Sequence, residues 1–145
     1  MANCLLPLVS SIVHPDQNGF IPGRATFLNT RRLCHIMGLV AGYESLPIAM
    51  SLDIEKAFDT LSWEYLWVVL EKLGIGPVFR RWVRLLYRAT RTRVRTGCCI
   101  SDSFQIHRGT RQGCPLSPII FALAMGPLAC WLRRRAAEWG IPEGE

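Results

Sequence analysis

The sequence predicts an α+β fold in which helices pack on a small sheet. Apolar residues recur at helical spacing in several separate segments, and one central stretch alternates in the way a β-hairpin does. Half of the 145 residues are hydrophobic, which is ample material for a buried core. No repeat, low-complexity tract or linker is visible, so we expect one continuous globular piece.

The first expected elements are a turn, a helix and a strand. Gly and Pro stand at loop spacing between Gly19 and Arg24. Pro47 then opens a short apolar run, Ile48 to Ile54, which is typical of a buried strand. Between them, the apolar residues at helical spacing that predict an amphipathic helix are Leu33, Ile36, Met37 and Val40.

Two further helices are expected in the centre of the chain. Ser62 is a candidate N-cap for the first, which Gly74 should end. Pro77 suits the first turn of the second, in which Arg80, Arg84 and Arg88 follow one another at i+4 spacing. The apolar positions of the two helices are Trp63, Leu66, Trp67 and Leu70, then Val78, Phe79, Trp82, Val83 and Leu86.

A hairpin and a last helix complete the expected order. From Arg91 to Arg95 the pattern alternates, with Arg91, Arg93 and Arg95 on one face, and Gly97 supplies the turn. Ser117 and Pro118 should start a helix that kinks or breaks at Gly126-Pro127.

The charge of the chain is concentrated in arginine. The net charge is +6, and 15 of the 17 basic residues are Arg, whose rigid fork of donors grips phosphate oxygens in pairs. Nine of these Arg lie between Arg80 and Arg111, where Asp102 is the only acid. Such a cluster suits a phosphate backbone, although a solvated helix face would have the same pattern.

Cysteine spacing and proline content bear on the setting. The six Cys form no C-x-x-C pair and have no matching His, which argues against a zinc site and a disulfide framework and favours a reducing intracellular setting. The segment from Gly113 to Leu132 is uncharged over 20 residues, but Pro115, Pro118 and Pro127 interrupt it. Since each proline removes a backbone donor, we expect no membrane span.

Two segments carry residues suited to chemistry. Asp53 ends the apolar run before Ile54, and a carboxylate there either binds a divalent cation or caps the turn after the strand. The run from Arg108 to Pro118 is a Gly- and Pro-rich loop that leads into a helix N-terminus, where free N–H groups favour phosphate. Read alone, this second segment is equally an ordinary capped loop.

Together these segments resemble the reverse transcriptases of non-LTR (LINE-type) retrotransposons. The resembling residues are Gln17 to Arg24, Asp53 to Asp59 and, as R-G-x-R-Q-G-C-P-L-S-P, Arg108 to Pro118. The resemblance covers essentially the whole chain. It implies a partial right-hand polymerase, with fingers over about residues 1–50 and palm over residues 51–145, truncated at both ends.

The resemblance also implies residue roles. Asp53 matches the first catalytic aspartate, which binds Mg²⁺, and the backbone carbonyl of Ile54 is a further expected ligand. Phe58 matches the aromatic gate that lies against the deoxyribose and excludes a 2′-hydroxyl. Gln112 and Gly113 match the loop that contacts the incoming nucleotide and the template base. Arg24, in the fingers segment, is expected to touch template or triphosphate.

The expected partners are an RNA template, a DNA primer, deoxynucleoside triphosphates and the remainder of a polyprotein. The family's aromatic-x-Asp-Asp motif has no match in this sequence, so we expect the chain to be inactive alone. The alternative is a noncatalytic nucleic-acid-binding remnant that uses the arginine cluster. The nucleic-acid-binding candidates are Arg80, Arg84, Arg88, Arg91, Arg93, Arg95, Arg108 and Arg111.

Overall fold

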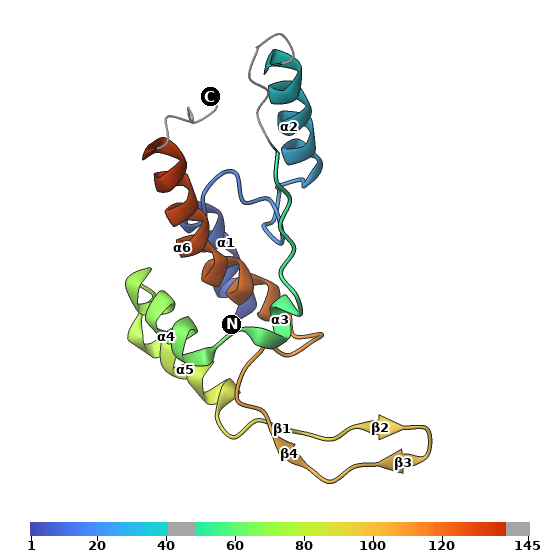
Figure 1. Ribbon diagram of the computed structural model, residues 1–145. Helices are drawn as coiled ribbons and strands as arrows, with labels where there is room; N and C mark the ends of the chain where they lie inside the picture. Colours follow the sequence, from blue (N-terminus) through green and yellow to red (C-terminus); the bar gives the residue numbers. More distant parts are fainter. Residues whose placement is uncertain (41–48, 139–145) are drawn as a thin grey trace.

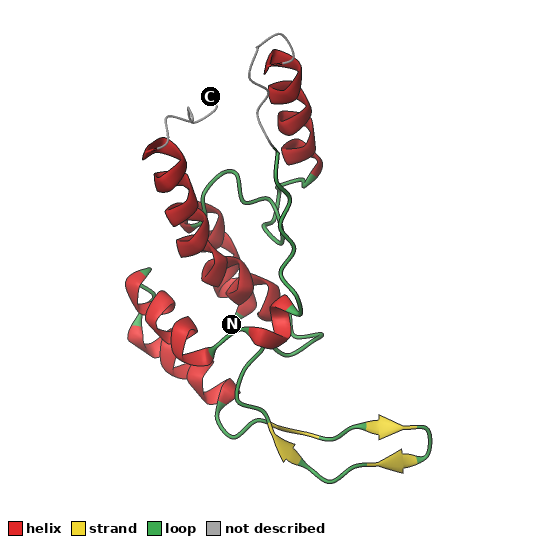
Figure 2. Ribbon diagram, viewed as in Figure 1, coloured by secondary structure: helices red, strands yellow, loops and turns green. Residues whose placement is uncertain are grey.

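The computed structural model describes residues 1–40 and 49–138, and these form six helices and four short strands (Figures 1 and 2). The mixture of helices with a small amount of sheet agrees with the predicted α+β class. In chain order the elements are α1 (Ala2–Ile12), α2 (Phe27–Val40), α3 (Ala57–Thr60), α4 (Trp63–Lys72), α5 (Pro77–Tyr87), β1 (Arg91–Thr92), β2 (Arg95–Thr96), β3 (Cys99–Ile100), β4 (Phe104–Gln105) and α6 (Ser117–Glu138).

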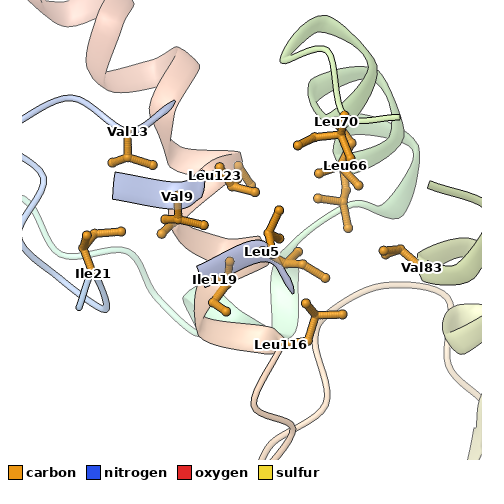
Figure 3. Packing of buried hydrophobic residues seen from close by; sticks show 14 of the residues in the cluster. Leu5, Val9, Val13, Ile21, Leu66, Leu70, Val83, Leu116, Ile119 and Leu123 are labelled. Atoms are coloured by element: carbon orange, nitrogen blue, oxygen red, sulfur yellow. The ribbon is translucent and has the colours of Figure 1, made fainter. Parts of the chain in front are cut away.

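The core is built around the first half of α6. Helices α1 and α4 both pack against α6, and α5 packs against α4. Figure 3 shows the side chains that meet there, with Leu5 from α1, Leu66 from α4 and Leu123 from α6. Each fully buried aliphatic side chain contributes about 1.5–3 kcal/mol. The largest of them are Leu66, Leu70, Ile120, Leu123, Val9 and Val83.

The ends of α4 and α5 are those predicted. The Ser62 hydroxyl accepts a bond from the backbone N–H of Tyr65 and so caps α4. Gly74 has φ +72°, and the N–H of Ile75 donates back to the carbonyl of Leu70, which closes the helix. Pro77 occupies the first turn of α5.

The predicted apolar face of α5 is only partly buried. Val83 is fully buried, whereas Val78 and Trp82 are more than half exposed. The reason is that α5 packs mainly against α4, which covers only part of the predicted face.

The predicted hairpin is confirmed, but its place in the fold is not. Strand β1 pairs with β4 and β2 with β3, both antiparallel, and Gly97 at φ +60° lies in the turn. The strands are two residues long and mostly exposed, and Figure 1 shows the hairpin extending away from the helices. The expectation that helices pack on a sheet is therefore wrong for the described residues, in which helices pack on one another.

The buried strand predicted from Ile48 to Ile54 is also wrong where it can be observed. Pro47 and Ile48 lie outside the described residues, and residues 49–54 form no strand. Met50 is 77% exposed and Leu52 76% exposed. All four strands of the described part belong to the hairpin, so this apolar run has no strand beside it to pair with.

Helices α1, α2 and α6 differ from the expectations in other ways. The sequence did not predict α1, which buries Leu5 and Val9 against the core despite Pro7. Helix α2 is confirmed, but Leu33, Ile36 and Met37 of its predicted apolar face are exposed, and Figure 1 shows α2 standing apart from the other helices. Helix α6 is continuous through Pro127, so a break is not formed there, and the alternative of a kink stays a prediction. In the two described ranges, no helix has both the length and the apolar character that crossing a membrane requires.

Candidate functional site

Two segments far apart in the sequence are bonded to each other. The backbone N–H of Thr110 donates to the carbonyl of Phe58 at 2.7 Å, and that of Gly109 donates to the carbonyl of Leu61 at 2.8 Å. The indole N–H of Trp63 donates to the carbonyl of Gly109 at 2.7 Å. The loop that enters α6 is thus fixed on the segment that enters α4.

Gly109 is required for this close approach. Its φ is +86°, a region that side chains rarely adopt, and a Cβ built on it would lie 2.7 Å from the backbone oxygen of Asp59. Backbone atoms cannot move aside as a flexible side chain can. The glycine therefore allows the two segments to dock.

Phe58 lies where the three resembling segments meet. Its ring is 5.5 Å from that of Phe20, in an edge-on arrangement, and 4.5 Å from that of Phe121 in α6. Phe20 belongs to the turn before Arg24, and Phe121 follows the loop that contains Gln112. Aromatic pairs at these distances stabilise one another by about 0.5–1.5 kcal/mol. The ring of Phe58 is thereby held in one place.

A cavity of about 410 Å³ opens beside Phe58, and Gln112 and Gly113 also line it. Gln112 is exposed. Gly113 has φ +80°, a backbone conformation that glycine adopts easily and other residues rarely do. The structure brings these three residues together. Their individual roles stay predictions.

A larger cavity of about 820 Å³ shares Thr110, Arg111 and Gln112 with the first. Such a volume is within the range of small-ligand sites. Its lining has one acid, Asp59, and four cations: Lys56, Arg91, Arg108 and Arg111. In the described part of the chain, no acid forms an ion pair with Arg108 or Arg111. The cavity is therefore suited to an anionic ligand such as a phosphate group.

Tyr87 lines the larger cavity and is buried. Burial raises the pKa of the Tyr87 phenol, and a hydrogen bond with Ser117 and the charge of Arg111 oppose this rise only in part. The phenol therefore keeps its proton at neutral pH. Tyr87 contributes shape and a hydrogen-bonding group to the site but no charge.

Asp53 is placed differently from the other candidates. Its side chain is exposed, as is Ile54, and Asp53 is absent from the walls of both cavities. The strand that should have carried it is not formed. Among the residues that the structure describes, no three His, Cys, Asp or Glu side chains gather closely enough to hold a metal ion. The metal-binding role of Asp53 and Ile54 stays a prediction.

Arg24 is engaged within the fold. Its guanidinium donates to the carbonyls of His14 at 2.6 Å, Ser10 at 2.8 Å, Gln17 at 2.9 Å and Val13 at 3.1 Å. The positive group thus closes the C-terminal end of α1, where helix carbonyls are unpaired. This structural role accounts for the residue, and the predicted nucleotide contact stays untested.

The arginine cluster divides into one structural member and an exposed set. Arg80 is partly buried and pairs with Glu71 at 2.6 Å, so it ties α5 to α4. Arg91 bonds to Ser103 across the hairpin. The exposed members are Arg81, Arg84, Arg88, Arg91, Arg93, Arg95, Arg108 and Arg111.

Several residues of the site were not singled out from the sequence. Phe20, Lys56 and Ala89 are the non-glycine residues with positive φ in the described ranges. Phe20 contacts Phe58 and Lys56 lines the larger cavity, whereas Ala89 lines a separate groove next to α5. Strained backbone of this kind gathers at functional sites. No periodicity reports it, because φ depends on the tertiary contacts. Phe121 was also missed, since its position in an apolar helix looks like core.

Comparisons with known proteins identify the family of this chain. A family model described as "Reverse transcriptase (RNA-dependent DNA polymerase)" matches residues 1–142. The chain is 36% identical over 135 residues to the "Transposon TX1 uncharacterized 149 kDa protein" of Xenopus laevis, covering 90% of this chain and 10% of that protein.

Two R2 element proteins are also similar. Identity is 34% over 135 residues to the "Retrovirus-related Pol polyprotein from type-2 retrotransposable element R2DM" of Drosophila melanogaster, covering 90% of this chain and 12% of that protein. The chain is 30% identical over 122 residues to the "Retrovirus-related Pol polyprotein from type-1 retrotransposable element R2" of Popillia japonica, covering 83% of this chain and 17% of that protein. The chain thus spans a small part of these relatives, which are non-LTR retrotransposon proteins. It belongs to the reverse transcriptase family.

Proposed function

We propose that this chain forms the nucleotide-contacting part of a reverse transcriptase in a non-LTR retrotransposon protein, and that it serves RNA-templated DNA synthesis. One observation carries the proposal: Phe58, Gln112 and Gly113 line one cavity, in a chain whose family is established. The partners are an RNA template, a DNA primer and deoxynucleoside triphosphates. In this proposal about residues 1–50 belong to the fingers and 51–145 to the palm.

Each cavity residue has a definite task in this proposal. Phe58, fixed between Phe20 and Phe121, lies against C2′ of the sugar, where a 2′-hydroxyl would collide with the ring. Gln112 and Gly113 contact the incoming nucleotide and the template base. Arg108 and Arg111, which lack acidic partners among the described residues, hold phosphate oxygens.

The metal site is incomplete in the described residues. The family uses divalent metal ions, and Asp53 with the carbonyl of Ile54 is the group we assign to Mg²⁺. One carboxylate does not hold two Mg²⁺ ions firmly. We therefore expect the chain by itself to bind nucleotide but not to extend a primer, and a primer-extension assay with and without Mg²⁺ measures this.

Sugar discrimination tests the proposal. The affinities for a deoxynucleoside and a ribonucleoside triphosphate, with Mg²⁺ present, are compared in the parent chain and in Phe58→Val. We expect the parent to prefer the deoxynucleotide and Phe58→Val to lose most of that preference. The matched control is Phe104→Val on the exposed strand β4, which should change nothing. Equal affinity of the parent chain for both sugars would contradict the proposal.

A further inference from the structure

A groove lies between α4 and α5, apart from the two cavities of the candidate site. It has a volume of about 580 Å³, and its lining contains three aromatic and three arginine side chains but no acid. We call it the aromatic–arginine groove. The residues that define it are Trp63, Trp67, Arg81, Arg84, Tyr87 and Arg88.

The aromatic side of this groove is held rigidly. The rings of Trp63 and Trp67 lie 5.3 Å and 6.0 Å from that of Tyr87, which is buried. Trp63 is fixed further by its bond to Gly109. Both tryptophans are only partly buried, so parts of two ring faces, inclined at 50° and 60° to the Tyr87 ring, reach solvent.

The arginine side follows one face of α5. Arg81, Arg84 and Arg88 stand at i, i+3 and i+7, which places them in a row. The guanidinium carbon of Arg84 lies 5.6 Å from the centre of the Trp67 ring. Within the described part of the chain, neither Arg81 nor Arg88 has an ion-pair partner. The row therefore offers positive charge to a ligand.

These two sides together fit one class of ligand. A single nucleic-acid strand exposes base faces that stack on aromatic rings and phosphates that pair with arginine. A duplex hides its base faces, so it could use only the arginine row. We propose that the aromatic–arginine groove binds a single strand of nucleic acid.

This proposal extends the proposed function. It depends on that function in one respect, namely that the chain acts on nucleic acid. The groove and the larger cavity share Trp63 and Tyr87 in their walls. The groove is therefore a neighbour of the larger cavity, which Gln112 also lines. The groove is a second binding site, for a single strand, separate from the cavity proposed to bind the incoming nucleotide.

Binding of a labelled single strand to the 145-residue chain tests this. The probes are a short RNA, the DNA of the same sequence and the corresponding DNA duplex, followed by fluorescence anisotropy across a salt series. We expect either single strand to bind more tightly than the duplex. The better of the two single strands identifies which one the groove holds.

Exposed arginines give the decisive variants, because their removal leaves the core intact. We expect Arg81→Ala and Arg88→Ala each to weaken single-strand binding and to reduce the slope of log affinity against log salt by about 0.7. Arg31→Ala, which removes an equal charge from exposed α2, is the matched control. Equal affinities and slopes for all three variants would overturn the proposal.

Stacking is tested at Trp67. We expect Trp67→Leu to weaken single-strand binding about tenfold and Trp67→Phe, which keeps a ring, to weaken it less. Thermal unfolding checks that each variant folds. If Trp67→Leu does not fold, the arginine variants alone test the groove. Triphosphate binding is measured separately at Phe58, so either proposal can fail while the other stands. Duplex binding as tight as single-strand binding would also overturn this one.

Discussion

Two parts of one sequence motif behave differently in this fold. The segment from Phe58 to Trp63 is bonded to the loop before α6, the Phe58 ring lies against another ring, and the Trp63 indole donates to a carbonyl. A few residues earlier, Asp53 and Ile54 are exposed and belong to no helix or strand. The first part is held by partners from distant sequence, whereas the second has none among the described residues.

The difference shows where the order of the site comes from. The sequence suggested that a buried strand would end at Asp53. In the structure that strand is not formed in the described residues, and the contacts of Phe58 with Phe20 and Phe121 and the docking at Gly109 hold Phe58 and the loop before α6 together. Changes in the docked part should therefore cost stability, and changes in the exposed part should not.

The largest effect is expected at Gly109. Replacing it by alanine puts a methyl group against the Asp59 backbone and forces a side chain into positive φ, so Gly109→Ala should lower the free energy of unfolding by about 2–5 kcal/mol. Urea denaturation measures this. Gly97→Ala is the control, since its φ is also positive but nothing lies within 4 Å. If both variants lose the same stability, the docking contact is not what matters.

Arg24 should come next. Arg24→Met removes four bonds to carbonyls at the end of α1 and in the turn that follows it, and it should cost about 2–3 kcal/mol. Arg31→Met on exposed α2 should leave the unfolding midpoint almost unchanged. A fully stable Arg24→Met variant with weakened triphosphate binding would instead favour the nucleotide contact suggested by the family resemblance.

A smaller loss is expected from Trp63. In Trp63→Phe the ring remains but the N–H that donates to Gly109 is gone, which should cost about 1–2 kcal/mol. Trp82→Phe serves as control, because Trp82 is 55% exposed. Thermal unfolding of both variants compares them, and equal stability would show that the bond to Gly109 does not hold the loop.

The smallest effect is expected in the exposed segment. Leu52 is 76% exposed, so Leu52→Ser should change the free energy of unfolding by less than about 0.5 kcal/mol. The comparison variant is Leu66→Ala, which opens a cavity in the core and should cost about 2–5 kcal/mol. A large loss in Leu52→Ser would mean that this segment is packed in solution.

Local features of the fold could be predicted from the sequence because they depend on neighbours in the chain. The cap at Ser62, the end at Gly74, the start at Pro77 and the turn at Gly97 are all of this kind. Proximity of Phe58 to Gln112 was implied by the family resemblance. It could not have come from spacing, since 54 positions separate them in the printed sequence.

The predictions that were wrong concern features that depend on neighbouring segments of the fold. An apolar run such as residues 49–54 has the composition of a strand, but a strand also needs another strand to pair with. The apolar face of α2 needs a surface to cover it, and α6 does not break at Pro127 while its first half is packed in the core. Patterns along a sequence report what a segment favours, not what lies beside it.

Triphosphate binding at Gln112 tests most directly whether the docked loop and Phe58 form one nucleotide site. Affinity for a deoxynucleoside triphosphate with Mg²⁺ is measured by calorimetry for the parent, Gln112→Ala and Gln105→Ala, whose side chain is exposed on β4. We expect Gln112→Ala to bind about tenfold more weakly, the loss of one hydrogen bond, and Gln105→Ala to match the parent. Unchanged affinity in Gln112→Ala would contradict the assignment of this cavity to the nucleotide.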